Sequence, residues 1–210
     1  MLSAGASTPK TDPALKPNAP ATDTPAPKTG GTADVSKKPL PPLALDGLWQ
    51  SACYPGEEKG TSIAYGYTFD GDYVDAVDFY YSDSDCSTLS YYFIFTHTYK
   101  TGDVSTKIAE AREIDFQLTQ ARLVAKTEES ALQLRQLFSQ SNNEDCKNTK
   151  VDIDVATDVT SCGLIPKSNY NVVKVDGSKL IFGNCDADDA CNTKDKRATE
   201  LEDKYATKAK

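Results

Sequence analysis

The chain contains a single histidine, His97, which lies between two threonines in the stretch YYFIFTHTYK (residues 91–100). An imidazole beside hydroxyl groups could act as a general base in an enzyme. Such a base needs a nucleophile and a carboxylate that orients it, and no local motif such as G-x-S-x-G supplies them. We therefore expect His97 to be a hydrogen-bonded structural residue, and we expect no enzymatic activity.

Eight of the eleven tyrosines lie between residues 65 and 99. Side chains alternate between the two faces of a strand, so ring-bearing residues gather on one face of the stretches 61–69 and 91–99. These candidate ligand-binding residues are Tyr65, Tyr67, Tyr91, Phe93, Phe95, His97 and Tyr99. They could form the wall of a barrel cavity for an apolar or aromatic ligand, with phenol and imidazole groups that orient it. The alternative is a filled core with ordinary cross-strand aromatic pairs.

Six cysteines stand at positions 53, 86, 146, 162, 185 and 191, and none is part of a C-x-x-C pair. Zinc sites need cysteine and histidine ligands at short spacing, so a zinc site is not expected. The acidic stretch DADDAC (186–191) lacks the glycine and the glutamate that a hand-type calcium loop requires at its sixth and twelfth positions. We expect no metal and no other cofactor. An even number of well-spread cysteines instead predicts three disulfides made in an oxidising compartment.

Alternating apolar patterns place these residues on β-strands. The predicted strands cover residues 47–54, 61–69, 72–81, 88–100, 112–127, 149–157, 170–175 and 179–185. One helix is expected over residues 128–140, where apolar residues recur at helical spacing after Thr127 as the N-cap. Short strands joined by hairpins favour a mainly β fold, an antiparallel up-and-down barrel of eight or nine strands with one short helix.

The first 43 residues differ in composition from the rest of the chain. They hold nine of the eleven prolines and almost no large apolar residue, so they cannot bury enough surface to fold. We expect a disordered tether over residues 1–43 and one barrel domain over residues 44–210. The chain has a net charge of −8, and lysine exceeds acid in the tether, so the domain itself is strongly acidic. An acidic domain repels phosphate, which excludes nucleic acid as a partner.

Gly47 and Trp49, at the start of the first predicted strand, resemble the G-x-W signature of the lipocalin (calycin) superfamily. In that superfamily the tryptophan closes one end of the barrel, and a basic residue near the end of the last strand lies across its indole. The resemblance implies that Arg197, shortly after the last predicted strand, makes this cation–π contact. Trp49 and Arg197 are then structural residues.

Three further motifs together resemble a group of bacterial lipocalin-like lipoproteins: W-x-x-x-C at 49–53, YYSDSDC at 80–86 and KRATEL at 196–201. This resemblance implies a Cys53–Cys86 disulfide, and pairing of nearest neighbours then implies Cys146–Cys162 and Cys185–Cys191. The stretch LSAG (2–5) is similar to the end of a bacterial lipoprotein signal, although Ala6 stands where the cysteine that receives lipid would follow. Any link to a membrane would be a lipid anchor at the N-terminus.

The sequence thus predicts a monomeric, non-enzymatic binding module on a tether, exported to the bacterial periplasm or the outer-membrane surface. Its partner would be a small hydrophobic or aromatic ligand held in the barrel. The alternative is a filled barrel that contacts a protein partner through its loops, as an inhibitor, an adhesin or an envelope component. Whether the aromatic face encloses space or packs solid distinguishes these two functions.

Overall fold

The computed structural model describes residues 40, 42–185 and 191–209. The chain divides into two units, Met1–Lys38 and Pro39–Lys210, and all described residues lie in the second. Residues 1–39 and 41 of the expected tether, with the LSAG stretch, lie outside the described residues, as do residues 186–190 of the acidic stretch.

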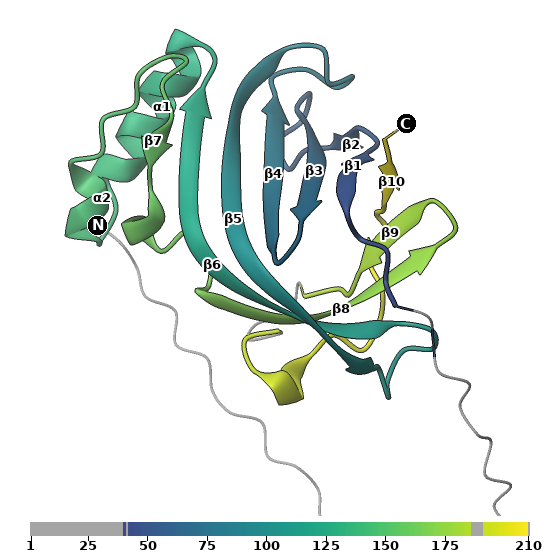
Figure 1. The fold of residues 1–210 in the computed structure, drawn as a ribbon. Helices are drawn as coiled ribbons and strands as arrows, with labels where there is room; N and C mark the ends of the chain where they lie inside the picture. Colours follow the sequence, from purple (N-terminus) through teal and green to yellow (C-terminus); the bar gives the residue numbers. More distant parts are fainter. Residues whose placement is uncertain (1–39, 41, 186–190, 210) are drawn as a thin grey trace, which may run out of the picture. The chain divides into compact units, whose positions relative to one another are not determined.

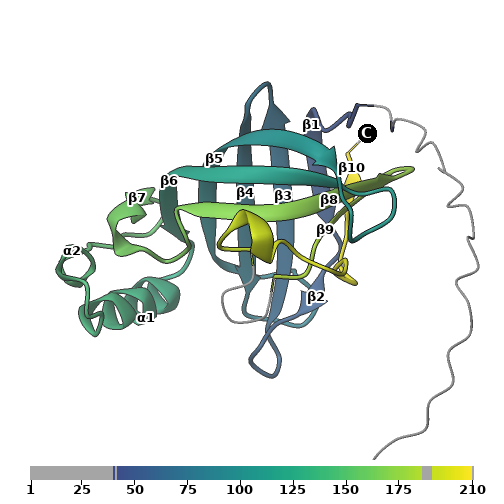
Figure 2. The ribbon, with the colours of Figure 1, turned by 90° about the horizontal axis from the view of Figure 1, so that it is seen from below.

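The barrel is closed by β1 (Gly47–Ser51), which pairs antiparallel with both β3 (Ser62–Asp70) and β10 (Ala206–Lys208). Between those two partners the circuit runs through β4 (Tyr73–Tyr81), β5 (Leu89–Val104), β6 (Arg112–Ala125), β8 (Ser168–Asp176) and β9 (Lys179–Phe182). Each strand pairs antiparallel with its neighbours, and the long strands β5 and β6 curve around the barrel (Figures 1 and 2). The predicted up-and-down barrel is confirmed, with eight strands in the closed circuit.

Two short strands lie outside this circuit. Strand β2 (Tyr54–Pro55) pairs with β3, and β7 (Thr157–Asp158) pairs with β6. The predicted strand 149–157 is therefore wrong over most of its length. The last strand, β10, was not predicted, because its three residues are too few to show an alternating apolar pattern.

Helix α1 (Glu128–Ser139) begins where the sequence predicts, because Thr127 caps it. The Thr127 hydroxyl accepts a hydrogen bond from the Ser130 amide, and the Ser130 side chain accepts one from the Thr127 amide in a reciprocal capping box. One face of α1 packs on Leu123 and Ala125 of β6. The buried residues of that face are Ser130, Ala131, Leu134 and Phe138.

Three shorter helical segments complete the domain: α2 (Glu144–Lys147), η1 (Thr160–Cys162) and η2 (Lys194–Lys196). In Figure 1, α1, α2 and β7 lie beside the upper half of β6, and β8 crosses its lower half. Among the described helices, none is long and apolar enough to cross a membrane.

The six cysteines form three disulfides, Cys53–Cys86, Cys146–Cys162 and Cys185–Cys191, which are the pairs implied above. Cys53–Cys86 joins the segment after β1 to the loop between β4 and β5. Cys146–Cys162 joins α2 to η1. All six cysteines lie outside the β-strands, so the disulfides connect loops and short helical segments.

The sizes of the closed loops predict how much each disulfide stabilises the fold. Cys53–Cys86 spans 33 residues and Cys185–Cys191 spans 6. The chain-entropy relation gives about 4 kcal/mol for the larger loop and about 2 kcal/mol for the smaller. Replacing both cysteines of a pair by serine should therefore lower the free energy of unfolding more for Cys53/Cys86 than for Cys185/Cys191, as measured by denaturant titration. Equal losses for the two pairs would contradict this order.

Candidate functional site

Strand pairing arranges the inner face of β3, β4, β5 and β6 in successive cross-strand rows, because directly opposed residues point to the same face. From the open end inward, the rows are Ile63–Tyr80–Tyr91–Ala125, Tyr65–Asp78–Phe93–Leu123, Tyr67–Ala76–Phe95–Ala121 and Phe69–Val74–His97–Leu118. Tyr99 opposes Phe116 one step further along. All seven residues predicted to share a face therefore lie on the inner one.

The inner half of the barrel is filled by packed rings. Tyr67 lies 5.0 Å from Phe182, and Phe69 lies 5.2 Å from Tyr99, between ring centroids. These rings surround Trp49, which is 1% exposed and donates a hydrogen bond of 2.6 Å from its indole N–H to the Leu45 carbonyl. For Tyr67, Phe93, Phe95, His97 and Tyr99 the filled-core alternative therefore describes the structure better than the cavity.

The open end of the barrel encloses a cavity of about 720 Å³. Its walls are the loop 55–61, the adjoining ends of β3, β4 and β5, the first two turns of α1 and Lys204. Only Tyr65 and Tyr91 of the seven predicted residues line it. The other lining residues are Pro55, Gly56, Glu57, Glu58, Thr61, Ser62, Ile63, Asp78, Tyr80, Tyr81, Ser82, Thr88, Ser90, Thr127, Glu129, Gln133 and Lys204.

Asp78 is the most deeply placed acidic residue among the lining residues that the sequence analysis did not predict. It occupies the second row, between Tyr65 and Phe93. Part of its surface is open to the cavity, and protein surrounds the rest, so burial raises the pKa of its carboxyl to about 6. Within the part of the chain that the structure describes, its carboxylate has neither a hydrogen bond nor an ion pair. At neutral pH the cavity thus holds an ionised and unpartnered carboxylate.

Neutral phenols surround this carboxylate. Burial raises the pKa of the Tyr65, Tyr80 and Tyr91 hydroxyls, so all three keep their protons at neutral pH. The Tyr80 and Tyr91 rings stack at 4.6 Å with an interplanar angle of 12°. The Lys204 ammonium lies 3.5 Å from the Tyr65 hydroxyl, and 5.5 Å and 5.7 Å from the ring centres of Tyr65 and Tyr54. The cavity can therefore offer hydroxyl donors, ring faces and one buried negative charge.

His97 has the structural environment expected from the sequence. Its Nδ1 lies 3.1 Å from the Phe95 carbonyl, which can only accept, so Nδ1 carries the proton. Burial lowers the pKa of the imidazole, which is neutral at pH 7. Its ring meets Phe116 edge-on at 5.8 Å. Among the described residues no nucleophile or carboxylate is hydrogen-bonded to this ring.

Arg197 does not lie across Trp49, so that implied contact is wrong. The Lys208 ammonium lies over the indole instead, 5.4 Å from the ring centre, because β10 follows Arg197 and pairs with β1 beside Trp49. The last strand predicted from the sequence ends at residue 185, so the prediction did not include β10, which carries Lys208.

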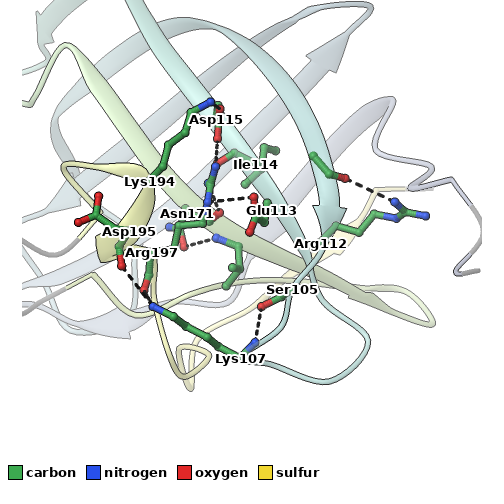
Figure 3. Close-up of polar contacts among 12 residues, drawn as sticks. Ser105, Lys107, Arg112, Glu113, Ile114, Asp115, Asn171, Lys194, Asp195 and Arg197 are labelled. Carbon is green, nitrogen blue, oxygen red and sulfur yellow. Dashed lines mark hydrogen bonds and ion pairs between the residues drawn. The ribbon is translucent and has the colours of Figure 1, made fainter. Parts of the chain in front are cut away.

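Arg197 lies instead against β6 and β8, where it makes several polar contacts (Figure 3). Its guanidinium donates to the carbonyls of Ile114 and Asn171 at 3.2 Å and 2.9 Å, and it bonds the Asp115 carboxylate. Its Nε lies 3.2 Å from a Glu113 carboxylate oxygen. Only 6% of Arg197 is exposed, so it fixes the segment after β9 to the outer face of β6 and β8.

Asp78 had a weak signal in the sequence, since it alternates with Val74, Ala76 and Tyr80 in the strand DYVDAVDFYY. The other phase of that strand holds Asp75 together with Val77, Phe79 and Tyr81, so both phases combine apolar or aromatic residues with at least one aspartate. Alternation alone could not tell which aspartate faces inward. The pairing register of β4 with β3 and β5 decides it.

Comparison with protein families gives a match over most of the chain. The family model described as adenomatosis polyposis coli down-regulated 1 matches residues 35–185, well over half of the chain. No curated protein matches the chain. The family match, which is to a eukaryotic secreted family, overturns the resemblance to bacterial lipocalin-like lipoproteins; what remains of that resemblance is the barrel.

The raised pKa of Asp78 predicts that this residue destabilises the fold at neutral pH. The native state binds its proton more tightly than the unfolded chain, so stability falls as pH rises from about 4 to about 6 and stays low above that range. Asp78→Asn should raise the free energy of unfolding by about 1–3 kcal/mol at pH 7 relative to its effect at acid pH. Denaturant titrations at both pH values measure this difference.

Asp75→Asn is the matched control on the opposite face of β4. The Asp75 carboxylate accepts a hydrogen bond of 2.6 Å from the Thr96 hydroxyl, so its loss should bring no stability gain at neutral pH. If both substitutions shift stability alike at the two pH values, Asp78 is not the desolvated group described here.

Arg197 and Lys208 should contribute differently to the stability of the fold. Arg197→Ala removes the buried guanidinium that bonds two carbonyls and the carboxylates of Glu113 and Asp115, so it should lower the free energy of unfolding by about 2–4 kcal/mol. Lys208→Ala removes one exposed cation–π contact and should cost less than about 1 kcal/mol. Denaturant titration of both variants measures these losses in the free energy of unfolding. A larger loss for Lys208→Ala would contradict this order and would show that the cation over Trp49 stabilises the fold more.

Proposed function

The chain belongs to the adenomatosis polyposis coli down-regulated 1 family, and we propose that its barrel is a non-enzymatic module that binds a small ligand of apolar or aromatic character. The observation that carries the proposal is the cavity of about 720 Å³ at the open end of the barrel. Ligand cavities commonly enclose about 300–1,000 Å³, and an eight-stranded barrel has room for one small ligand.

The filled inner half of the barrel restricts where a ligand can lie. Packed rings occupy the rows that contain Tyr67, Phe69 and Tyr99, so the ligand binds between the second row and the mouth. There it meets Tyr65, Tyr80 and Tyr91, whose rings offer apolar surface and whose hydroxyls offer hydrogen bonds.

The positions of Asp78 and His97 support a binding function rather than a catalytic one. Asp78 lies in the second row and His97 in the fourth. Two rows along a strand correspond to about 13 Å, so these two groups cannot act as one acid–base pair. Neither has a nucleophile bonded to it among the described residues.

The three disulfides support an oxidising, exported environment, as in other disulfide-stapled domains. A monomer and a lipid anchor remain predictions from the sequence. No bacterial location is proposed, because the family match removes its basis.

A second candidate function is contact with a protein partner, and one observation favours it. Leu132 and Leu137 of α1 are large apolar side chains that are 60% and 61% exposed. An interaction module would use such a surface, and it would need no hollow barrel.

Narrowing the cavity mouth tests the ligand-binding proposal. Gln133 is exposed on α1 and lines the cavity, so Gln133→Trp should fill part of the mouth without disturbing the core. Diphenylhexatriene, a neutral probe that fluoresces in apolar surroundings, should bind the unmodified domain saturably and bind Gln133→Trp at least about fivefold more weakly, a loss of about 1 kcal/mol.

Gln136→Trp is the control, since Gln136 is exposed on the same helix and does not line the cavity. Its probe affinity should equal that of the unmodified domain. Absence of saturable binding, or equal losses in the two variants, would reject the cavity as the binding site and favour contact through α1.

A further inference from the structure

We propose that the ligand of this cavity is a cation, a protonated amine or a quaternary ammonium on an apolar body, whose charge lies against the Asp78 carboxylate. This inference rests on the proposed binding function and names the chemical class of its ligand.

The first support is the position of Asp78 within the cavity. It lies one row deeper than Tyr80 and Tyr91, and the next row, with Ala76 and Phe95, belongs to packed protein. The carboxylate therefore stands at the floor of the cavity. A ligand that enters from the mouth presents its leading end to Asp78, and its body fills the space beside the Tyr80–Tyr91 pair.

The second support is that the protein leaves Asp78 without a partner. Charged groups in folded proteins are seldom buried unless they are paired, because desolvation of an unpaired charge is costly. Among the described residues nothing donates to this carboxylate, and burial alone accounts for its shifted titration. Lys204 lines the same cavity but bonds the Tyr65 hydroxyl instead. A cationic ligand would supply the missing partner.

The third support is the charge of the whole lining. Glu57, Glu58 and Glu129 add three carboxylates near the mouth, and Lys204 is the one basic residue among the lining side chains. This arrangement attracts a cation and opposes an anion, which would bring a further negative charge towards Asp78 without any guanidinium to receive it.

The fourth support is the aromatic wall. Ring faces attract ammonium groups within about 6 Å, most strongly where water is excluded. The Lys204 ammonium already makes such contacts with Tyr54 and Tyr65 at the edge of the cavity. Tyr65, Tyr80 and Tyr91 surround Asp78 on the inside and would serve a ligand cation in the same way.

Three probes with one body and different charges test the proposal: neutral diphenylhexatriene, its trimethylammonium derivative and its propionic acid derivative. Binding to the full chain is measured by fluorescence at pH 7.5 in about 0.5 M salt, which screens the exposed glutamates more than the buried Asp78. We expect the trimethylammonium probe to bind at least tenfold more tightly than the propionate probe. Asp78→Asn should remove most of that preference, and its affinity for the neutral probe measures any change in the cavity that does not depend on ligand charge.

The matched control is Glu129→Gln, which removes a mouth carboxylate and should change the preference less than twofold at this salt concentration. Equal affinities of the charged probes, or an equal loss of all three in Asp78→Asn, would overturn the cation assignment while leaving the binding function intact. If none of the three probes binds, the proposed function itself fails.

The pH dependence gives an independent readout, because the trimethylammonium charge does not titrate. The titratable groups that line the cavity together with Asp78 are Tyr65, Tyr80, Tyr81, Tyr91, Lys204, Glu57, Glu58 and Glu129. Burial raises the pKa of the Tyr65, Tyr80 and Tyr91 hydroxyls, so these phenols keep their protons from acid to neutral pH. Affinity for the cationic probe should fall about tenfold between pH 7.5 and pH 5 in the unmodified chain and in Glu129→Gln, and not in Asp78→Asn. A fall that persists in Asp78→Asn would assign it to the glutamates and overturn the proposal.

Discussion

The double pairing of β1 with β3 and β10 is the constraint on which the rest of the structure depends. Without it the sheet would have two free edges, and neither of its faces would be fully enclosed. Closure makes one face of every strand the interior, so the pairing register decides which side chains leave water. Asp78 is inside for that reason alone, since its partners Tyr65 and Phe93 are fixed on the inner face.

The two ends of the barrel then serve different purposes. Trp49 and the rings around it fill the end beneath β1, and Arg197 fixes the segment after β9 to the outside of β6 and β8. At the other end, Cys53–Cys86 holds the loops next to the cavity mouth, and α1 forms one of its walls. The packed core and the disulfide stabilise the fold, so it can tolerate an unpaired charge at the floor of the cavity. Binding sites commonly contain such locally destabilising groups.

Sequence reasoning recovered what local patterns determine. Alternation located most strands and the inward set from Tyr65 to Tyr99, and the capping residue Thr127 located α1. Local patterns did not predict the features that depend on the pairing register between strands distant in the sequence. Asp75 and Asp78 stand in opposite phases of one mixed strand, and only pairing with β3 and β5 separates them. β10 has three residues, so neither it nor the Lys208 contact with Trp49 could be seen beforehand. The division between filled core and hollow mouth depends on side-chain packing that periodicity does not contain.

The most direct measurement is an NMR titration of the Asp78 carboxyl carbon, with and without the trimethylammonium probe. An unpartnered carboxylate at the cavity floor should titrate with a pKa of about 6 in the free protein, and the bound cation should lower that value. Titration near the ordinary aspartate value of about 4, unchanged by the probe, would show that Asp78 is solvated or already paired. The cavity would then have no charged floor.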